Sequence, residues 1–340
     1  MSKTFLQIFQ HHYFRFMNTK KVLLIFIAFF MFIECFSWGF FGHKLINRLA
    51  VFTLPEKLLP FYKSNIDYVT DHAPDPDKRR YVMKEEACRH YFDVDHYERV
   101  LPIDTVPHLW KEAVLKYTED TLNAYGIVPW YINLMKFKLT EAFKARDVEK
   151  ILKLSADIGH YLADANVPLH ATENYNGQLT GQNGIHGFWE SRVPELFNSN
   201  YHFFVGKAFY VNDVQKAAWI AIEGSFAGKD SVLDFEKKLN ATFPSDKKYM
   251  HVQKGNKQVK IYSKEYTAQY EKMLHGQVER RLRASILLVG SIWYTAWVDA
   301  GQPDVSDLKS TPKKVTDDER KKMIEEEKKL LDQQMIGREE

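Results

Sequence analysis

Two histidines and an aspartate near the middle of the chain have the residue types and spacing of a metal site. His160 and Asp164 are four residues apart, which places them on one face of a helix. That face is otherwise apolar, and a buried carboxylate beside a buried imidazole needs compensation, which a cation supplies. Pro168 ends the helix, so His170 lies in the loop that follows and can reach the same pocket.

A second pair, His186 and Glu190 in IHGFWES, repeats the four-residue spacing. Either pair alone is also compatible with an ordinary pair on a helix surface. Two such pairs with His170 between them favour a metal site. Imidazoles and carboxylates without a thiolate are typical of zinc in hydrolytic enzymes.

Further donors precede these pairs in the sequence. His90 lies in RHYFDVD, and Asp75 precedes it by fifteen residues in the acidic segment HAPDPDKRR. Asp71 and Asp77 are alternatives to Asp75, and an acidic Pro-containing segment is also typical of a simple turn.

The N-terminus has the pattern of a signal peptide. Lys20 and Lys21 precede an apolar run over 22–33, which is too short to cross a bilayer comfortably. We expect a signal peptide over 1–37, with Met17 as an alternative start and an uncleaved anchor as the alternative interpretation. The protein is then exported, periplasmic or secreted, in a bacterium.

Cleavage after Ser37 would create a new N-terminus at Trp38, in the segment WGFFGH. The freed α-amino group would lie five residues before His43. An amine, a carbonyl oxygen and an imidazole together can ligate zinc.

In this order, the motifs resemble those of a superfamily that joins bacterial zinc-dependent phospholipases C with single-strand-specific zinc nucleases. They are W-G-x-x-G-H at a processed N-terminus, an Asp before H-F/Y-x-D, H-x-x-x-D-x5-H and H-x-x-x-D/E. The similarity covers Trp38 to Asp299. It implies a compact, mainly α-helical single domain with a cleft for three zinc ions.

The resemblance also implies the ligands of each ion. The first ion would be held by Asp75, His90, His160 and Asp164, the second by His170, His186 and Glu190, and the third by Trp38, His43 and the bridging Asp164. A hydroxide between two zinc ions would attack phosphorus. Arg79 or Lys78 would hold a phosphoryl oxygen, and Tyr91 would stack on a base or a head group.

The substrate expected from this resemblance is a phosphodiester, as in phospholipase C. Glu190 instead of Asp, a short loop between His170 and His186, and the lack of disulfide cysteines favour a phospholipid at a membrane surface. A single-strand-specific endonuclease or 3′-nucleotidase is the first alternative, supported by Trp189 before Glu190. The second is an exported zinc-binding protein without turnover.

Composition is that of an ordinary globular protein and excludes a disordered chain, a fibrous repeat and a multi-span membrane protein. The chain has 340 residues, of which 45% are hydrophobic and 27% charged, and it has 2 cysteines. Its formal net charge is +3, and the segment 1–37 contributes that excess, so no basic field for long nucleic-acid duplexes remains. No feature points to an obligate protein partner.

Helices must position these residues. Apolar periodicity predicts a domain over 38–302, built from helices over 148–165, 265–300, 43–52, 107–125, 128–145 and 211–223. Loops are expected over 172–187 and 246–264, without hairpins. The charged tail over 303–340 is interpreted as a solvated helix or extension, with a partner-binding helix as the alternative.

Overall fold

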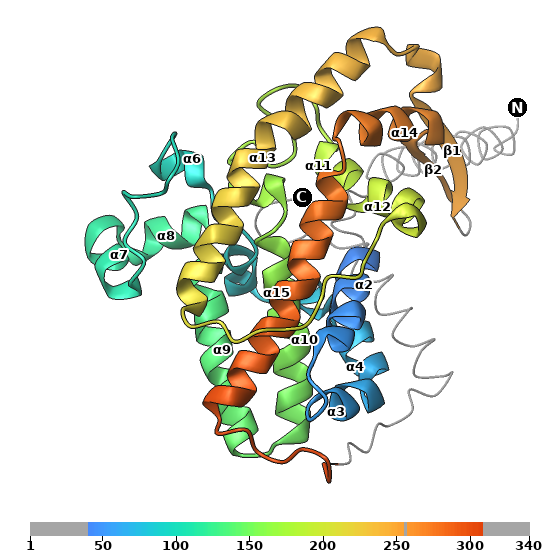
Figure 1. The fold of residues 1–340 in the computed structure, drawn as a ribbon. Coiled ribbons are helices and arrows are strands. Elements are labelled where there is room, and N and C mark those ends of the chain that lie inside the picture. The colour runs from blue at the N-terminus through green and yellow to red at the C-terminus, as the bar shows by residue number, and fades with distance from the viewer. Residues whose placement is uncertain (1–39, 255–256, 309–340) are drawn as a thin grey trace, which may run out of the picture.

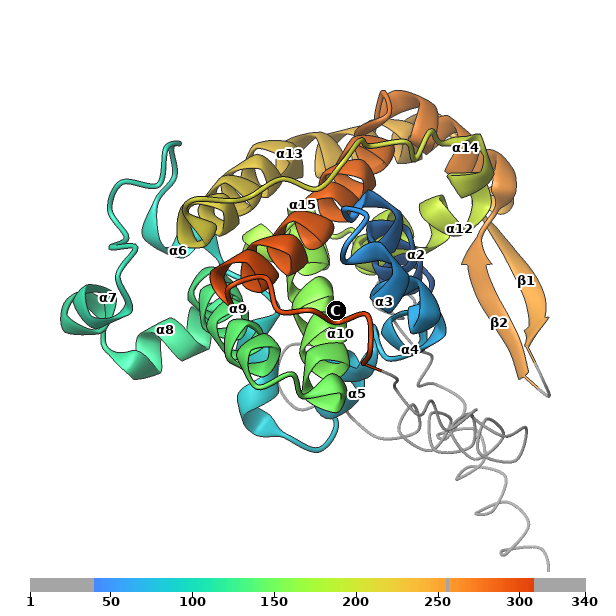
Figure 2. The same ribbon diagram turned by 60° about the horizontal axis from the view of Figure 1, so that its bottom comes forward.

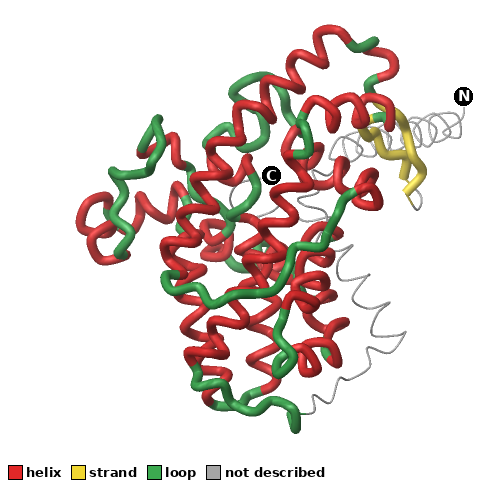
Figure 3. Tube along the Cα trace, viewed as in Figure 1, coloured by secondary structure: helices red, strands yellow, loops and turns green. Residues whose placement is uncertain are grey.

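The structure is a computed structural model and describes residues 40–254 and 257–308. Within these residues the chain is mostly helical, with a single two-stranded antiparallel sheet (Figure 3). The expected mainly α fold is confirmed. Trp38, the segment 1–37 and most of the charged tail lie outside the described residues.

The longest helices form the body of the molecule (Figure 1). They are α9 (Val128–Lys144), α10 (Val148–Asp164), α13 (Val214–Thr242) and α15 (Gln277–Asp299). Helix α10 lies among the others and packs against α9, α15, α2 and α4.

Shorter helices surround this body. On one side lie α2 (Phe41–Ala50), α3 (Leu59–Ser64), α4 (Ile66–Asp71) and α5 (Asp75–Arg79). An arm made of α6 (Val94–Tyr97), α7 (Trp110–Tyr117) and α8 (Glu119–Tyr125) projects opposite the β-hairpin (Figure 2). The remaining helices and strands are α11 (Ile185–Gly187), α12 (Val193–Phe197), β1 (Tyr249–Lys254), β2 (Lys257–Tyr262) and α14 (Lys264–Met273).

Helix α10 has the bounds that its sequence predicts. Asp147 accepts a hydrogen bond from the Lys150 backbone N–H at 3.1 Å, an N-cap contributing about 1 kcal/mol. All residues over 155–164 are buried. The polar side chains at the end of this helix therefore project into the interior of the protein.

A close contact between α2 and α10 sets the positions of two histidines. A Cβ at Gly159 would lie 2.1 Å from Asn47 Oδ1, so only glycine fits there. Asn47 donates hydrogen bonds to the carbonyls of Val69 and Ala156. Because His43 is one turn before Asn47 and His160 follows Gly159, the same contact brings these two rings together.

Helix α13 continues well beyond the predicted end at 223. Gly224 and Gly228 weaken the helical signal in the sequence. In the structure both glycines face α15: a Cβ would lie 2.7 Å from Arg281 Nη1 at Gly224 and 3.1 Å from Gln277 Nε2 at Gly228. Tertiary packing thus outweighs local propensity.

Three other predicted elements differ from the structure. The helix expected over 107–125 is divided into α7 and α8 at Thr118, whose φ is +69°. The helix expected over 265–300 is divided at Gly276, whose φ of +74° allows the turn between α14 and α15. The expected loop over 246–264 contains the hairpin β1–β2, whose first pair is Tyr249 with Tyr262. The Phe188 ring stacks on Tyr262 with centroids 3.8 Å apart, which stabilises a hairpin too small to be stable alone.

Residues at the end of the described chain pack onto the body. Val305 is buried, and Trp297 Nε1 donates to the carbonyl of Pro303 at 2.9 Å. Among the described helices, none has both the length and the apolar character needed to cross a membrane.

Candidate metal centre

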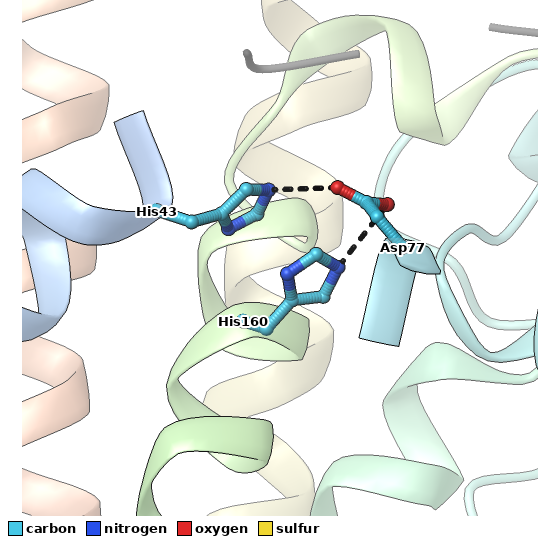
Figure 4. A group of neighbouring side chains, drawn as sticks. All are labelled: His43, Asp77 and His160. Carbon is cyan, nitrogen blue, oxygen red and sulfur yellow. Dashed lines mark ion pairs between the residues drawn. The ribbon is translucent and has the colours of Figure 1, made fainter. Parts of the chain in front are cut away.

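Five side chains from distant segments converge at the end of α10. His43 comes from α2, Asp77 from α5, His90 from the residue after a 3₁₀ helix over Lys84–Arg89, and His160 and Asp164 from α10. Figure 4 shows three of them pointing toward one another. All five are at most 6% exposed. We call this group the Asp164 cluster.

The two oxygens of Asp164 face different histidines. Oδ2 lies 3.0 Å from His90 Nδ1 and 3.1 Å from His160 Nε2. Oδ1 lies 3.5 Å from His43 Nε2. The His43 and His160 rings stack with centroids 3.8 Å apart. Asp164 therefore has the geometry of a carboxylate that can bridge two ions.

Asp77 occupies the place expected for Asp75. Its carboxylate lies 3.5 Å from His160 Nε2 and 3.9 Å from His43 Nε2 (Figure 4). It also lies 3.6 Å from His90 Nδ1. Asp75 is turned to His72 and Lys78, at 2.6 and 3.3 Å, and its side chain is 30% exposed. The choice of Asp75 is corrected, because two residues along a short helix change the face that a side chain occupies.

A second group, the Glu190 cluster, consists of His170, His186 and Glu190, each at most 1% exposed. Glu190 Oε2 lies 2.9 Å from His186 Nε2 and 3.6 Å from His170 Nε2. Glu190 belongs to a π-helical turn over Phe188–Arg192. Such turns are rare and are frequent at functional sites.

Backbone carbonyls orient three of the histidines. His160 Nδ1 lies 3.0 Å from the carbonyl oxygen of Ala73, and His170 Nδ1 lies 2.7 Å from that of His90. His186 Nδ1 lies 3.0 Å from the carbonyl oxygen of Tyr175. Since a carbonyl only accepts, each Nδ1 carries a proton, which leaves each Nε2 as the nitrogen that can ligate a metal ion held between it and the carboxylates.

The two clusters are physically connected. His170 Nδ1 bonds to the carbonyl of His90, and the Phe92 backbone N–H donates to the carbonyl of His170 at 2.9 Å. A shift of one histidine therefore moves a ligand of the other cluster.

Electrostatics at the Asp164 cluster favour a bound cation. Burial lowers the pKa of His43 well below its usual range, so this imidazole is neutral. Burial also opposes protonation of His160, but Asp164 and Asp77 outweigh it and raise the pKa of His160 to about 9. The carboxylates thus stabilise positive charge here, on a proton or on a metal ion.

The donor set fits zinc. Three groups of side chains each bring their ligand atoms within 4.8 Å of one another: His43, Asp77 and His160; His90, His160 and Asp164; His170, His186 and Glu190. All donors are imidazole nitrogens and carboxylate oxygens, as at hydrolytic zinc sites. Cys88 is a buried thiol that belongs to none of these groups.

Two residues expected to contact the substrate lie in other surroundings. The Arg79 guanidinium donates to Asp157 and Tyr161 at 3.1 Å and to Glu86 at 3.4 Å, so its donors serve a protein network. Tyr91 is 6% exposed and its hydroxyl donates to the carbonyl of Ala124. Protein partners thus engage both side chains in this structure, and their contact with a substrate stays a prediction.

The sequence interpretation also overlooked two buried residues near the cluster. Arg80 is fully buried, with Nη1 3.9 Å from Asp77 Oδ1. Glu86 is fully buried, and Oε1 lies 3.7 Å from His90 Nε2. Their spacings, three residues from Asp77 and four from His90, are the available sequence signal.

Comparisons with known proteins find matches among solved structures and none by sequence. No protein-family model and no curated protein matches the chain. Matching solved structures include an alpha-toxin from Clostridium absonum, at 12% identity and a TM-score of 0.47, covering 82% of this chain and 68% of the toxin. An alpha-toxin from an avian strain of Clostridium perfringens matches at 13% identity and a TM-score of 0.44, covering 81% and 66%. The chain spans about two thirds of each toxin, and likeness at this level carries no argument about function.

Proposed function

We propose that this protein is a zinc-dependent phosphodiester hydrolase of the superfamily that includes zinc phospholipases C. The observation that carries the proposal is the convergence of five buried histidines on three buried carboxylates, Asp77, Asp164 and Glu190. Each of the five histidines has a ring nitrogen 2.9–3.6 Å from a carboxylate oxygen of Asp164 or Glu190. Such a group of donors is costly to bury without a cation.

We assign the ligands in three sets. Asp77, His90, His160 and Asp164 would hold one ion, and His170, His186 and Glu190 a second. His43 and Asp164 would hold a third ion together with Trp38, which lies outside the described residues. The second set has three protein ligands, which leaves a coordination position for water or substrate, as at catalytic zinc sites.

Bound zinc ions would polarise the phosphodiester and lower the pKa of water toward about 7, which supplies a nucleophile at neutral pH. The chain's own residues supply the geometry. Asp164 ties His43 to His90 and His160 through its two oxygens. The backbone carbonyls behind His160, His170 and His186 fix the direction of each lone pair.

We favour a phospholipid as the substrate, cleaved between glycerol and the phosphorylated head group. Support comes from Glu190, from the short loop before His186, and from Cys88, which is a thiol and forms no disulfide. Trp189, the residue that suggested a nuclease, is fully buried and donates to Gln277 Oε1 at 3.0 Å. It is therefore a packing residue and gives no support to the nuclease alternative.

We further propose that 1–37 is a signal peptide, that 38–302 is the catalytic domain of an exported protein, and that 303–340 extends from it. The N-terminal sequence of the exported protein tests the first of these, with cleavage before Trp38 as the expected result.

The experiment that tests the function is a substrate panel at equal zinc. Phosphatidylcholine vesicles, single-stranded DNA and a 3′-nucleotide are offered to the purified protein, with the Glu190→Gln variant as the background. Release of phosphocholine that depends on Glu190 supports the proposal. Cleavage of DNA or of the 3′-nucleotide alone supports the nuclease, and zinc binding without turnover of any substrate supports the zinc-binding protein.

A further inference from the structure

His90 is oriented differently from the other histidines whose second nitrogen has a partner. In His160, His170 and His186, Nδ1 meets a backbone carbonyl and Nε2 faces the carboxylates. In His90, Nδ1 faces the cluster, 3.0 Å from Asp164 Oδ2. Its Nε2 faces a carboxylate of its own, Glu86 Oε1, at 3.7 Å.

Glu86 is held firmly in front of His90. Oε2 accepts a hydrogen bond from Arg89 Nη1 at 2.7 Å and one from Arg79 Nε at 3.4 Å. Oε1 accepts a hydrogen bond from the Tyr161 hydroxyl. With two guanidinium groups beside it, a carboxylate stays ionised even though it is fully buried.

Glu86 belongs to a wider network of charges. Arg79 also donates to Asp157 at 3.1 Å and Lys153 donates to Asp157 at 2.8 Å, so three basic side chains face two carboxylates. We call Arg79, Glu86, Arg89, Asp157 and Tyr161 the Glu86 network. Such a network is a rigid support, since removing one charge leaves another buried without its partner.

We propose that Glu86 is a positioning residue for His90. It holds the proton on Nε2 and thereby directs the Nδ1 lone pair toward Asp77 and Asp164, where the proposed function places a zinc ion. A carboxylate behind a ligating imidazole also makes it a stronger donor than a carbonyl does.

The distance of 3.7 Å exceeds hydrogen-bond length. A small rotation of the His90 ring would close it, and we expect that rotation when Nδ1 binds a cation. The inference rests on the proposed zinc centre for its effect on the metal. Without zinc, Asp164 at 3.0 Å competes with Glu86 for the His90 proton, so the Nε2-protonated form is expected once a cation occupies Nδ1.

The test compares two substitutions within the Glu86 network of the full chain. Glu86→Gln removes the charge that faces His90. Asp157→Asn is the matched control, because it removes a charge from the same network without contact to His90 in the structure. Zinc affinity is measured by competition with a chromogenic chelator, and folding by circular dichroism and thermal melting.

We expect Glu86→Gln to weaken one zinc ion by about 10–100-fold, the range found for residues behind metal ligands. Asp157→Asn should bind zinc with the affinity of the native chain, although it should lower the thermal stability about as much as Glu86→Gln does. In ¹⁵N spectra of the imidazoles at the same zinc concentration, the native chain should show His90 protonated on Nε2, and Glu86→Gln should show a mixture of both neutral forms.

Unchanged zinc affinity in Glu86→Gln would overturn the inference, as would equal losses in both variants that follow their thermal stability. A native chain that takes up no zinc would overturn the proposed function and this inference together, whereas a native chain that binds zinc with the same affinity as Glu86→Gln would overturn this inference alone. Should Glu86→Gln not fold, Glu86→Asp serves instead, since it keeps a charge for both arginines but withdraws it from His90.

Discussion

The charges of two buried carboxylates in this protein, Glu236 and Asp164, are compensated in different ways. Glu236 on α13 is 2% exposed and has a cation of its own, Lys248 Nζ at 2.9 Å. The Tyr266 hydroxyl and Gln182 Nε2 each donate to it at 2.7 Å. Asp164 is 1% exposed and faces three imidazoles.

The difference separates a structural carboxylate from one suited to bind an ion. Lys248 carries a permanent charge, so the Glu236 group is complete as the chain folds. Imidazoles are neutral donors for most of the pH range above their usual pKa, and they serve a metal ion as well as a proton. The Asp164 cluster should therefore gain most of its stability from a bound cation, and the Glu236 group should gain none.

The largest effect on bound zinc is expected for Asp164→Asn. Its two oxygens face ligands of two ions, so its loss should release both and lower turnover at least ~100-fold, a few kcal/mol of lost stabilisation. Zinc content and turnover are compared with those of Glu190→Gln, which should lose one ion. An Asp164→Asn variant with the zinc content and activity of the native chain would show that Asp164 does not bridge two ions.

A matched pair of neighbouring aspartates gives the next largest effect. Asp77→Asn should remove about one zinc ion, because Asp77 faces three histidines at 3.5–3.9 Å. Asp75→Asn should keep all zinc, because Asp75 is bonded to His72 and Lys78. The reverse result, zinc lost with Asp75 and kept with Asp77, would contradict the site as the structure describes it.

The N-terminus should affect only one ion. An α-amino group has a pKa of about 7.7–8.0 and can ligate zinc, whereas an amide nitrogen cannot. Protein that begins at Trp38 should therefore bind one ion more than protein with an additional Met before Trp38. Equal zinc and equal phosphodiesterase rates in the two forms would exclude an N-terminal ligand.

Glu236→Gln should leave bound zinc unchanged while it destabilises the fold by about 1.5–3 kcal/mol, as for lost hydrogen bonds to a charged group. Burial raises the pKa of Glu236, but Tyr266, Gln182 and Lys248 outweigh it and lower the pKa below 4.5. The contribution of ionised Glu236 to the free energy of unfolding is thus present above pH 4.5 and is lost as the pH falls. The variant should therefore lose less stability on acidification than the native chain. Thermal melts of both proteins between pH 3 and 7 measure this loss of stability. A Glu236→Gln variant that melts like the native chain but binds less zinc would contradict the structural role of Glu236.

Part of this site could be predicted from sequence because its residues lie on one helix. His160 and Asp164 are four residues apart on α10, and the N-cap Asp147 and Pro168 mark the helix ends. His186 and Glu190 also keep a local spacing, although a π-helical turn carries Glu190. Local periodicity was sufficient for these positions.

The residues that sequence reasoning missed depend on tertiary contacts. Which aspartate of DPDKRR faces inward is decided by the packing of α5 near α10, so Asp75 was chosen over Asp77. The second half of α13 is helical because its glycines pack against α15. Arg79 acquires its role from Glu86 and Asp157, of which Asp157 lies 78 residues away.

The measurement that tests the central claim most directly is metal analysis of the purified, exported protein by mass spectrometry. The proposed centre predicts about three zinc ions per chain, one for each set of ligands, with at least two resistant to dialysis. A chain that carries no zinc after exposure to it, or that holds the same zinc when Asp77, Asp164 and Glu190 are all replaced by their amides, would contradict the account.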